Sequence, residues 1–249
     1  MDPATIAQAL AVWFLPVVVA ITFHEAAHGW MAERCGDDTA RMLGRVSFNP
    51  IRHVDPFGTL LLPGLLLLFK APFLFGYAKP VPVNFRRLRH PKRDMIWVAL
   101  AGPGANILLA FAATLALNLL AFVPAALEPW ILANMIALLF VNVVLAVFNM
   151  IPLPPLDGGR VLTGLLPRAY AWRFARLEPF GILILIGVLF VLPFAAERLL
   201  GTPFDPLGAV LLPLVFDSML LIFRLSGSPL PIDQLINHLA YLLAGVPPP

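Results

Sequence analysis

Long stretches without charge are the feature that most limits the folds open to this chain of 249 residues. Residues 4–23 contain no Asp, Glu, Lys or Arg, and a helix of that length crosses one bilayer. Four further stretches are apolar and long enough to cross, the last of them interrupted only by Asp217: 95–123, 129–156, 179–196 and 206–223. We therefore expect an all-α polytopic membrane protein with about five transmembrane helices.

Composition supports a membrane protein and argues against other classes. Only 12% of the residues are charged and 60% are hydrophobic, whereas a soluble domain has about 25% charged residues. So few polar side chains could not cover the surface of a soluble domain. The net charge of +3 comes from too few cations to form a phosphate-binding face, so we expect no nucleic-acid partner. Cys35 is the single cysteine, which excludes an intrachain disulfide.

Basic residues indicate how the chain is oriented. Lys and Arg gather in residues 34–56, 79–93 and 157–178, and short cytoplasmic loops collect such residues. If all three stretches are cytoplasmic, segment 57–78 enters and leaves on one side. It is then a re-entrant or hairpin segment, in which short β-strands are allowed. The five crossings place the N-terminus outside and the C-terminus inside. We expect a multi-pass protein of the inner (plasma) membrane.

The chain shows no sign of a separate soluble domain. We expect residues 1–228 to form one integral membrane domain. Residues 229–249 are short and proline-rich, which predicts a C-terminal interfacial tail.

The sequence HEAAH, which begins at His24, has the H-E-x-x-H pattern of zinc hydrolases. Its spacing puts the imidazoles of His24 and His28 on one helix face, with Glu25 beside them. Two histidines buried only for packing would be the alternative, but ionisable groups at membrane depth are functional by default. Counted back from Arg34, His28 and His24 lie about 9 and 15 Å below the cytoplasmic boundary. The pattern predicts a zinc site inside the bilayer that opens toward the cytoplasm.

A catalytic zinc site takes three protein ligands and leaves one position for water, so a third ligand must come from elsewhere. The stretch 129–156 runs into NMIPLPPLDGG (149–159), where prolines end helical hydrogen bonding and two glycines follow Asp157. A broken helix at membrane depth is tolerated only where it lines a cavity or is buried in protein. Asp157 is therefore the predicted third ligand, although Asp-Gly alone is also ordinary turn chemistry.

Other polar residues receive simpler interpretations. Asp217 is a rival ligand, but Arg224 lies seven residues on and on the same helix face, which favours an ion pair. The remaining histidines lie in basic or terminal stretches, and we expect them in water: His53, His90 and His238. Residues 102–106 (GPGAN) indicate close helix packing, and Asn134 and Asn142 indicate interhelical hydrogen bonds. Residues 81–83 allow an extended edge for an unwound substrate, or a plain connector.

These motifs together resemble the site-2 protease family, the zinc intramembrane metalloproteases of peptidase family M50. The likeness covers about residues 10–165. Within the family, the chain resembles the compact bacterial members without PDZ or CBS domains. Its motifs are HEAAH (24–28), GRVSFNPIRHVDPFGT (44–59), FGYAKPVPVN (75–84), ALAGPGAN (99–106) and FNMIPLPPLDGGR (148–160).

The resemblance implies a zinc-dependent endopeptidase that cleaves transmembrane segments of other membrane proteins. His24, His28 and Asp157 would bind one Zn²⁺ per chain, and Glu25 would be the general base. It further implies that Asn149 holds the substrate or the developing oxyanion. From the residues alone, a membrane transporter of zinc or another divalent metal is the alternative function. The oligomeric state stays open.

Overall fold

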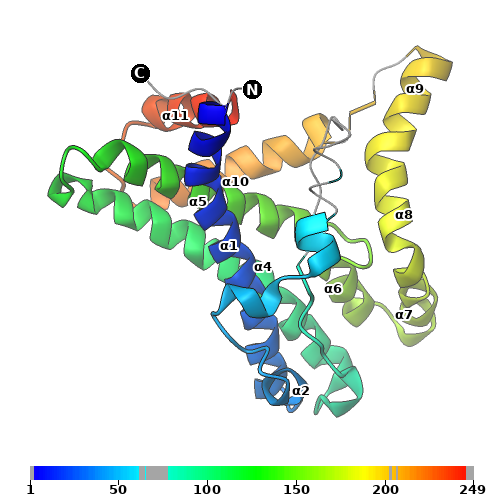
Figure 1. Cartoon of the computed structure of the whole chain (residues 1–249). Helices are drawn as coiled ribbons and strands as arrows, with labels where there is room; N and C mark the ends of the chain where they lie inside the picture. Colours follow the sequence, from blue (N-terminus) through cyan, green and yellow to red (C-terminus); the bar gives the residue numbers. More distant parts are fainter. Residues whose placement is uncertain (1–2, 62–64, 66–77, 202–203, 206, 245–249) are drawn as a thin grey trace.

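The computed structural model describes residues 3–61, 65, 78–201, 204–205 and 207–244. Helices account for nearly all of its regular structure (Figure 1), and the described residues contain no β-strand. The principal helices are α1 (Pro3–Arg34), α2 (Thr39–Met42), α4 (Pro91–Ala116), α5 (Glu128–Asn149), α6 (Asp157–Leu165), α7 (Arg168–Ala175), α8 (Gly181–Ile186), α9 (Leu192–Leu200), α10 (Leu212–Leu225) and α11 (Ile232–Ala244). Short 3-10 and π-helical segments connect several of them: η1 (Pro50–His53), η2 (Pro56–Leu61), η3 (Phe85–Arg87), η4 (Leu117–Phe122), η5 (Glu178–Phe180), η6 (Gly187–Val191) and η7 (Leu207–Leu211). The predicted all-α class is confirmed.

Five helical stretches are long and apolar enough to cross a membrane: Leu10–Arg34, Pro91–Phe122, Glu128–Asn149, Arg168–Leu199 and Gly208–Leu225. They correspond to the five apolar stretches of the sequence, so the prediction of a polytopic membrane protein is confirmed. The predicted re-entrant or hairpin segment 57–78 falls mostly outside the described residues, and only its start is seen, in η2.

Helices α1, α4 and α5 pack against one another at the centre of the molecule. Small side chains let these helices approach closely, as is usual between membrane helices. Nine alanines of these helices are no more than 5% exposed: Ala20, Ala26 and Ala32 on α1, Ala99, Ala110 and Ala113 on α4, and Ala133, Ala137 and Ala146 on α5. This bundle holds the middle of α1 against α4, where the candidate site lies.

Helices α10 and α11 join the same core. Met219 of α10 and Leu235 of α11 are fully buried in the cluster that α4 and α5 form. Figure 1 shows α11 and the start of α1 at the same end of the molecule. The predicted orientation, with the N-terminus outside and the C-terminus inside, stays a prediction. The domain division at residue 228 stays a prediction.

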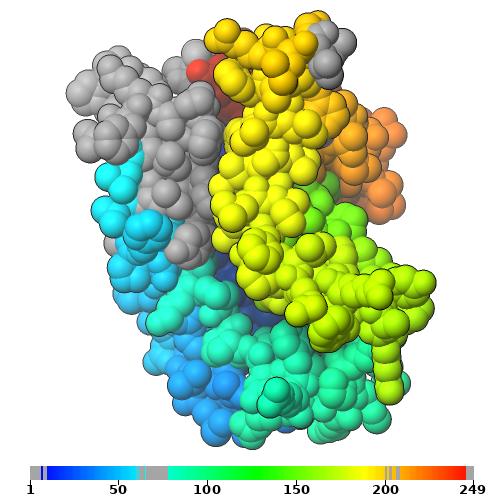
Figure 2. Space-filling view, turned by 90° about the vertical axis from the view of Figure 1, so that its right-hand side faces the viewer, coloured from blue at the N-terminus to red at the C-terminus, as the bar shows by residue number. Residues whose placement is uncertain are grey.

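Residues 178–200 form a row of helical segments, called the column below. The column packs against the helix bundle mainly at its N-terminal end, which is its foot. Figure 2 shows this column in yellow, running up one face of the molecule. At its foot, a Cβ added to Gly181 would collide with Pro154, so the column presses on the loop before Asp157. Higher up, a cavity of about 840 Å³ lies between the column and helices α4, α5 and α10.

Candidate metal centre

His24 and His28 lie on one face of α1, with their Nε2 atoms 3.0 Å apart. Because α1 is helical throughout this region, the four-residue spacing places the two rings one turn apart on the same face. Asp157 Oδ2 lies 3.2 Å from His24 Nε2 and 3.3 Å from His28 Nε2. All three side chains are buried. The structure thus brings together the three residues that the sequence predicted as metal ligands.

Asp157 reaches this position because the chain breaks after α5. Helix α5 ends at Asn149, and α6 begins at Asp157 after a loop with three prolines, which cannot continue a helix. A Cβ on Gly158 would collide with the carbonyl oxygen of Met150, so only glycine lets α6 start this close to the loop. The close approach directs the carboxylate of Asp157 back toward α1.

In each imidazole, a hydrogen bond at Nδ1, the nitrogen that faces away from the cluster, determines which ring nitrogen carries the proton. His24 Nδ1–H donates to Asn106 Oδ1 at 2.6 Å, and His28 Nδ1–H donates to the carbonyl oxygen of Val98 at 2.7 Å. The carbonyl can only accept, and the amide of Asn106 is oriented by donating to Ala20 O. Each neutral ring therefore presents an unprotonated Nε2 to the other and to Asp157.

The lone pairs of His24 Nε2, His28 Nε2 and Asp157 Oδ2 face one another, and such an arrangement requires a cation between them. Asp157 Oδ2 is buried and has no hydrogen-bond partner. In a tetrahedral zinc site, with ligand atoms about 2.0 to 2.1 Å from the metal, those atoms lie about 3.3 Å apart. The separations of 3.0 to 3.3 Å match this value. The residues present therefore fit zinc, with two imidazoles and one carboxylate as ligands.

Gly102 of α4 packs directly against the rings of His24 and His28. A Cβ added there would lie 2.6 Å from His24 Cε1 and closer still to His28 Nε2. Asn106, one turn on, is fully buried and also donates to Asn142 Oδ1 at 2.8 Å. The predicted close helix packing of residues 102–106 is confirmed at Gly102, Pro103 and Asn106 but not at the exposed Gly104, and the direct support of both histidines was missed. The i, i+4 spacing of Gly102 and Asn106 was the available signal, because it puts them on one face.

Glu25 is half-buried beside His24, and its Oε2 accepts a hydrogen bond of 2.8 Å from the N–H of Val81. Val81 lies in the irregular segment 78–84, which two buried side chains hold in place. Arg45 donates to the carbonyl oxygen of Lys79 at 2.6 Å, and Asp37 accepts from the N–H of Asn84 at 2.6 Å. The N–H of Val81 is thus bound to Glu25 and is not offered as a free edge.

The asparagines of α5 differ in their contacts. Asn142 makes the predicted interhelical bond, to Asn106. Asn134 instead donates to Trp130 O of its own helix, and its Oδ1 has no partner, so the prediction is wrong for this residue. Asn149 donates to Leu145 O at 3.0 Å, one turn back on α5. No hydrogen bond in the described part of the chain joins Asn149 to the metal cluster, and its role stays a prediction.

Several other predicted roles are corrected. Asp217 is exposed on α10, and the ion pairs of the described residues do not include the predicted pair with Arg224. His53, expected in water, is buried and its Nε2–H donates to Ser47 O at 2.8 Å. His90 is exposed, as predicted, whereas His238 is only half-exposed and its Nδ1 lies 2.8 Å from the carbonyl oxygen of Gln234. Burial, followed by the charge of Asp94, raises the pKa of the Cys35 thiol, so it is not poised as a nucleophile.

Comparisons with known proteins agree with this site. The sequence profile of peptidase family M50 matches residues 12–127 and 124–194. YwhC of Bacillus subtilis, named as a candidate zinc metalloprotease, is 37% identical over 186 residues, which cover 73% of this chain and 81% of that protein. Rip2 of Mycobacterium tuberculosis, named in the same way, is 31% identical over 176 residues, which cover 71% of this chain and 65% of that protein. No solved structure matches the chain. Both relatives are named as proteases and neither as a transporter.

Proposed function

Because the chain belongs to peptidase family M50 and is a multi-pass membrane metalloprotease, we propose that it cleaves transmembrane segments of other membrane proteins in a zinc-dependent reaction. The observation that carries this proposal is the convergence of His24, His28 and Asp157. Three buried acceptor atoms meet on the inner face of α1, inside a stretch that is long and apolar enough to cross a membrane.

These three side chains would hold one zinc ion per chain. Bound there, zinc supplies Lewis-acid chemistry, because it acidifies water and polarises a carbonyl oxygen. The chain itself holds Nδ1 of each imidazole against an acceptor, Asn106 Oδ1 or Val98 O, and leaves Nε2 to face the metal position. The fourth position of the site is left for water or a substrate oxygen.

Glu25 is the proposed general base. It would accept a proton from the attacking water and later deliver it to the leaving amine. The N–H of Val81 holds one carboxylate oxygen of Glu25 at 2.8 Å, which fixes the side chain without adding a second charge.

Asn149 is proposed to bind the substrate strand or its developing oxyanion. It stands where α5 ends and the loop to Asp157 begins. Its amide now donates to Leu145 O of its own helix, and a substrate carbonyl would replace that acceptor.

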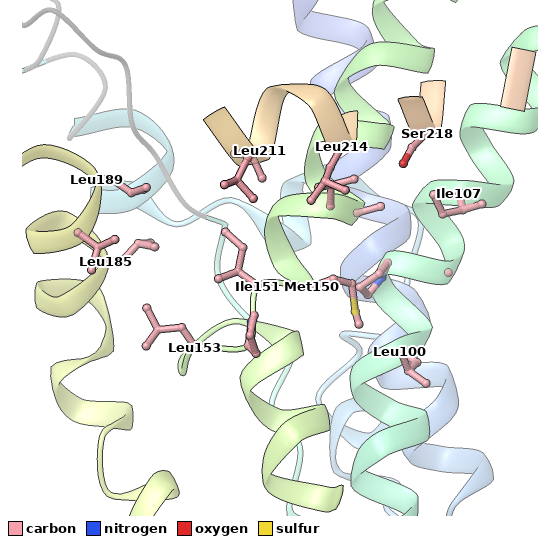
Figure 3. Close-up of a pocket in the computed structure, with 17 residues that line it drawn as sticks. Leu100, Ile107, Met150, Ile151, Leu153, Leu185, Leu189, Leu211, Leu214 and Ser218 are labelled. Carbon is pink, nitrogen blue, oxygen red and sulfur yellow. The ribbon is translucent and has the colours of Figure 1, made fainter. Parts of the chain in front are cut away.

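The cavity of about 840 Å³ favours apolar substrates. Figure 3 shows Leu100 and Ile107 of α4 on one side of this cavity and Leu185 and Leu189 of the column on the other. Met150, Ile151 and Leu153 also line it, and they belong to the loop that leads to Asp157. Apolar side chains of a transmembrane segment would fit between them. The segment must first unwind, because a helix keeps its carbonyls in its own hydrogen bonds, so we expect Gly or Pro near the cut.

We also propose that the protein lies in the inner (plasma) membrane, with its N-terminus outside. The basic stretches 34–56, 79–93 and 157–178 support this orientation, since cytoplasmic loops collect Lys and Arg. The metal cluster would then open toward the cytoplasm.

The experiment is cleavage of a model transmembrane substrate by the full-length protein in sealed liposomes, with the cut mapped by mass spectrometry. The proposal expects a cut within the apolar segment and none with Glu25→Gln, which leaves the three ligands intact. Full activity of Glu25→Gln, or cuts only in soluble loops, would overturn it.

A further inference from the structure

A second cavity, of about 630 Å³, lies away from the metal cluster where α4 and α7 begin. Lys92 and Arg93 of α4 line it, together with Arg168 of α7. His90 and the hydroxyl-bearing Thr163 also contribute, and no acidic side chain lines it. Its size is that of a small-molecule site, and its permanent charges are all positive.

The three cations of this cavity form no ion pair with any residue that the structure describes. None of the ion pairs or side-chain hydrogen bonds of the described residues involves Lys92, Arg93 or Arg168. Three other arginines do form ion pairs: Arg41 with Glu33, Arg87 with Asp38, and Arg160 with Glu178. The nearest carboxylate along the chain, Asp94, is buried and accepts a hydrogen bond from the N–H of His90. Within the described part of the chain, no carboxylate therefore pairs with the positive charges of the cavity.

The cavity lies at the ends of two stretches that are long and apolar enough to cross a membrane. Two of the membrane-spanning stretches begin at its walls, at Pro91 and at Arg168. Trp97, Tyr170 and Trp172, which flank it along α4 and α7, are each more than half exposed. Exposed Trp and Tyr mark the depth at which lipid headgroups lie. Figure 2 shows the start of α4 and helix α7 together in the lower part of one face.

From these contacts we propose that the cavity binds the phosphate of an anionic phospholipid headgroup at the cytoplasmic surface. Unpaired cations at headgroup depth are suited to a lipid phosphodiester, and basic pockets between membrane helices bind such headgroups. Thr163 offers a hydroxyl donor to the same group. A phosphate held between Lys92 and Arg168 would tie the start of α4 to α7. This proposal does not depend on the metal cluster.

Binding of dihexanoyl phosphatidylglycerol to the full-length protein in dodecyl maltoside, followed by native mass spectrometry, tests the proposal. Dihexanoyl phosphatidylcholine and inorganic phosphate serve as the comparison probes. We expect one tightly bound phosphatidylglycerol per chain and markedly weaker binding of both other probes. Equal binding of phosphatidylcholine would show that chain length alone drives association and would overturn the proposal. Equal binding of inorganic phosphate would show that the cavity recognises free phosphate rather than a lipid headgroup, and it would also overturn the proposal.

A matched pair of variants locates the site. Lys92→Gln/Arg168→Gln removes two charges from the cavity, and Arg86→Gln/Arg173→Gln removes two exposed charges that do not line it. The first variant should bind phosphatidylglycerol about thirtyfold more weakly, whereas the second should bind as the wild type does. Circular dichroism checks that both variants keep their helices. Equal losses in the two variants would contradict a defined site and leave only a general surface charge.

Discussion

The Nδ1 atom of His24 lies 2.6 Å from Oδ1 of Asn106, across the interface between α1 and α4. This contact assigns the proton of the ring to its outer nitrogen and leaves Nε2 free to face Asp157. Asn106 in turn donates to Ala20 O and to Asn142 Oδ1, so its orientation is set by three helices. The geometry of the candidate metal centre therefore depends on residues that never touch a metal.

Asn106→Leu should weaken zinc binding about ten- to a hundredfold, because the outer partner of a metal-bound histidine sets ring orientation and tautomer. Zinc affinity can be measured by competition with a chromogenic chelator. Asn134→Leu is the matched control, since Asn134 is equally buried but bonds only within α5. Unchanged zinc affinity in Asn106→Leu would refute the positioning role.

Gly102→Ala should lose zinc, since the added methyl group would collide with His24 and His28. Gly104→Ala should keep its zinc, because no atom lies within 4 Å of a Cβ at that position. Metal analysis of the two purified proteins by inductively coupled plasma mass spectrometry makes the comparison. Equal zinc contents would show that α4 does not support the histidines.

Val81→Pro removes the N–H that donates to Glu25 and suits a position that already precedes a proline. Hydrogen bonds to charged groups contribute about 1.5 to 3 kcal/mol, so kcat should fall roughly ten- to a hundredfold. Zinc content should not change, because the three ligands are untouched.

Val81→Ala keeps the N–H and is the control for loss of the side chain. If the kcat of Val81→Ala fell as far as that of Val81→Pro, packing of Val81 rather than its hydrogen bond would be responsible.

Asp157→Asn should abolish tight zinc binding, whereas Asp217→Asn should have no effect. Asp157 Oδ2 lies within 3.3 Å of both imidazoles, and Asp217 is exposed on a different helix. Equilibrium dialysis against zinc separates the two variants. A zinc loss in Asp217→Asn comparable to that in Asp157→Asn would reopen Asp217 as a ligand.

Sequence patterns were sufficient for the helices and for the three converging side chains. Helical periodicity alone places His24 and His28 on one face, and the prolines and glycines around Asp157 indicate a chain break. The contacts of Val98 and Val81 could not be read from the sequence, because they use backbone atoms, which every residue carries.

The failed predictions for Asp217 and His53 have separate physical causes. Asp217 and Arg224 share a helix face, but the side chains of exposed pairs gain little from meeting and need not do so. His53 lies in a basic stretch, yet the fold of residues 45–53 buries it against Ser47 O. Burial of a loop residue depends on tertiary packing, which local composition does not encode.

X-ray absorption at the zinc edge tests the metal centre most directly, on the full-length protein purified without chelators. We predict one zinc per chain with only nitrogen and oxygen ligands at about 2.0 to 2.1 Å, including two imidazoles. The imidazole signal should be lost in His28→Ala. A substoichiometric metal, a sulfur ligand, or an unchanged spectrum in His28→Ala would contradict a zinc site formed by His24, His28 and Asp157.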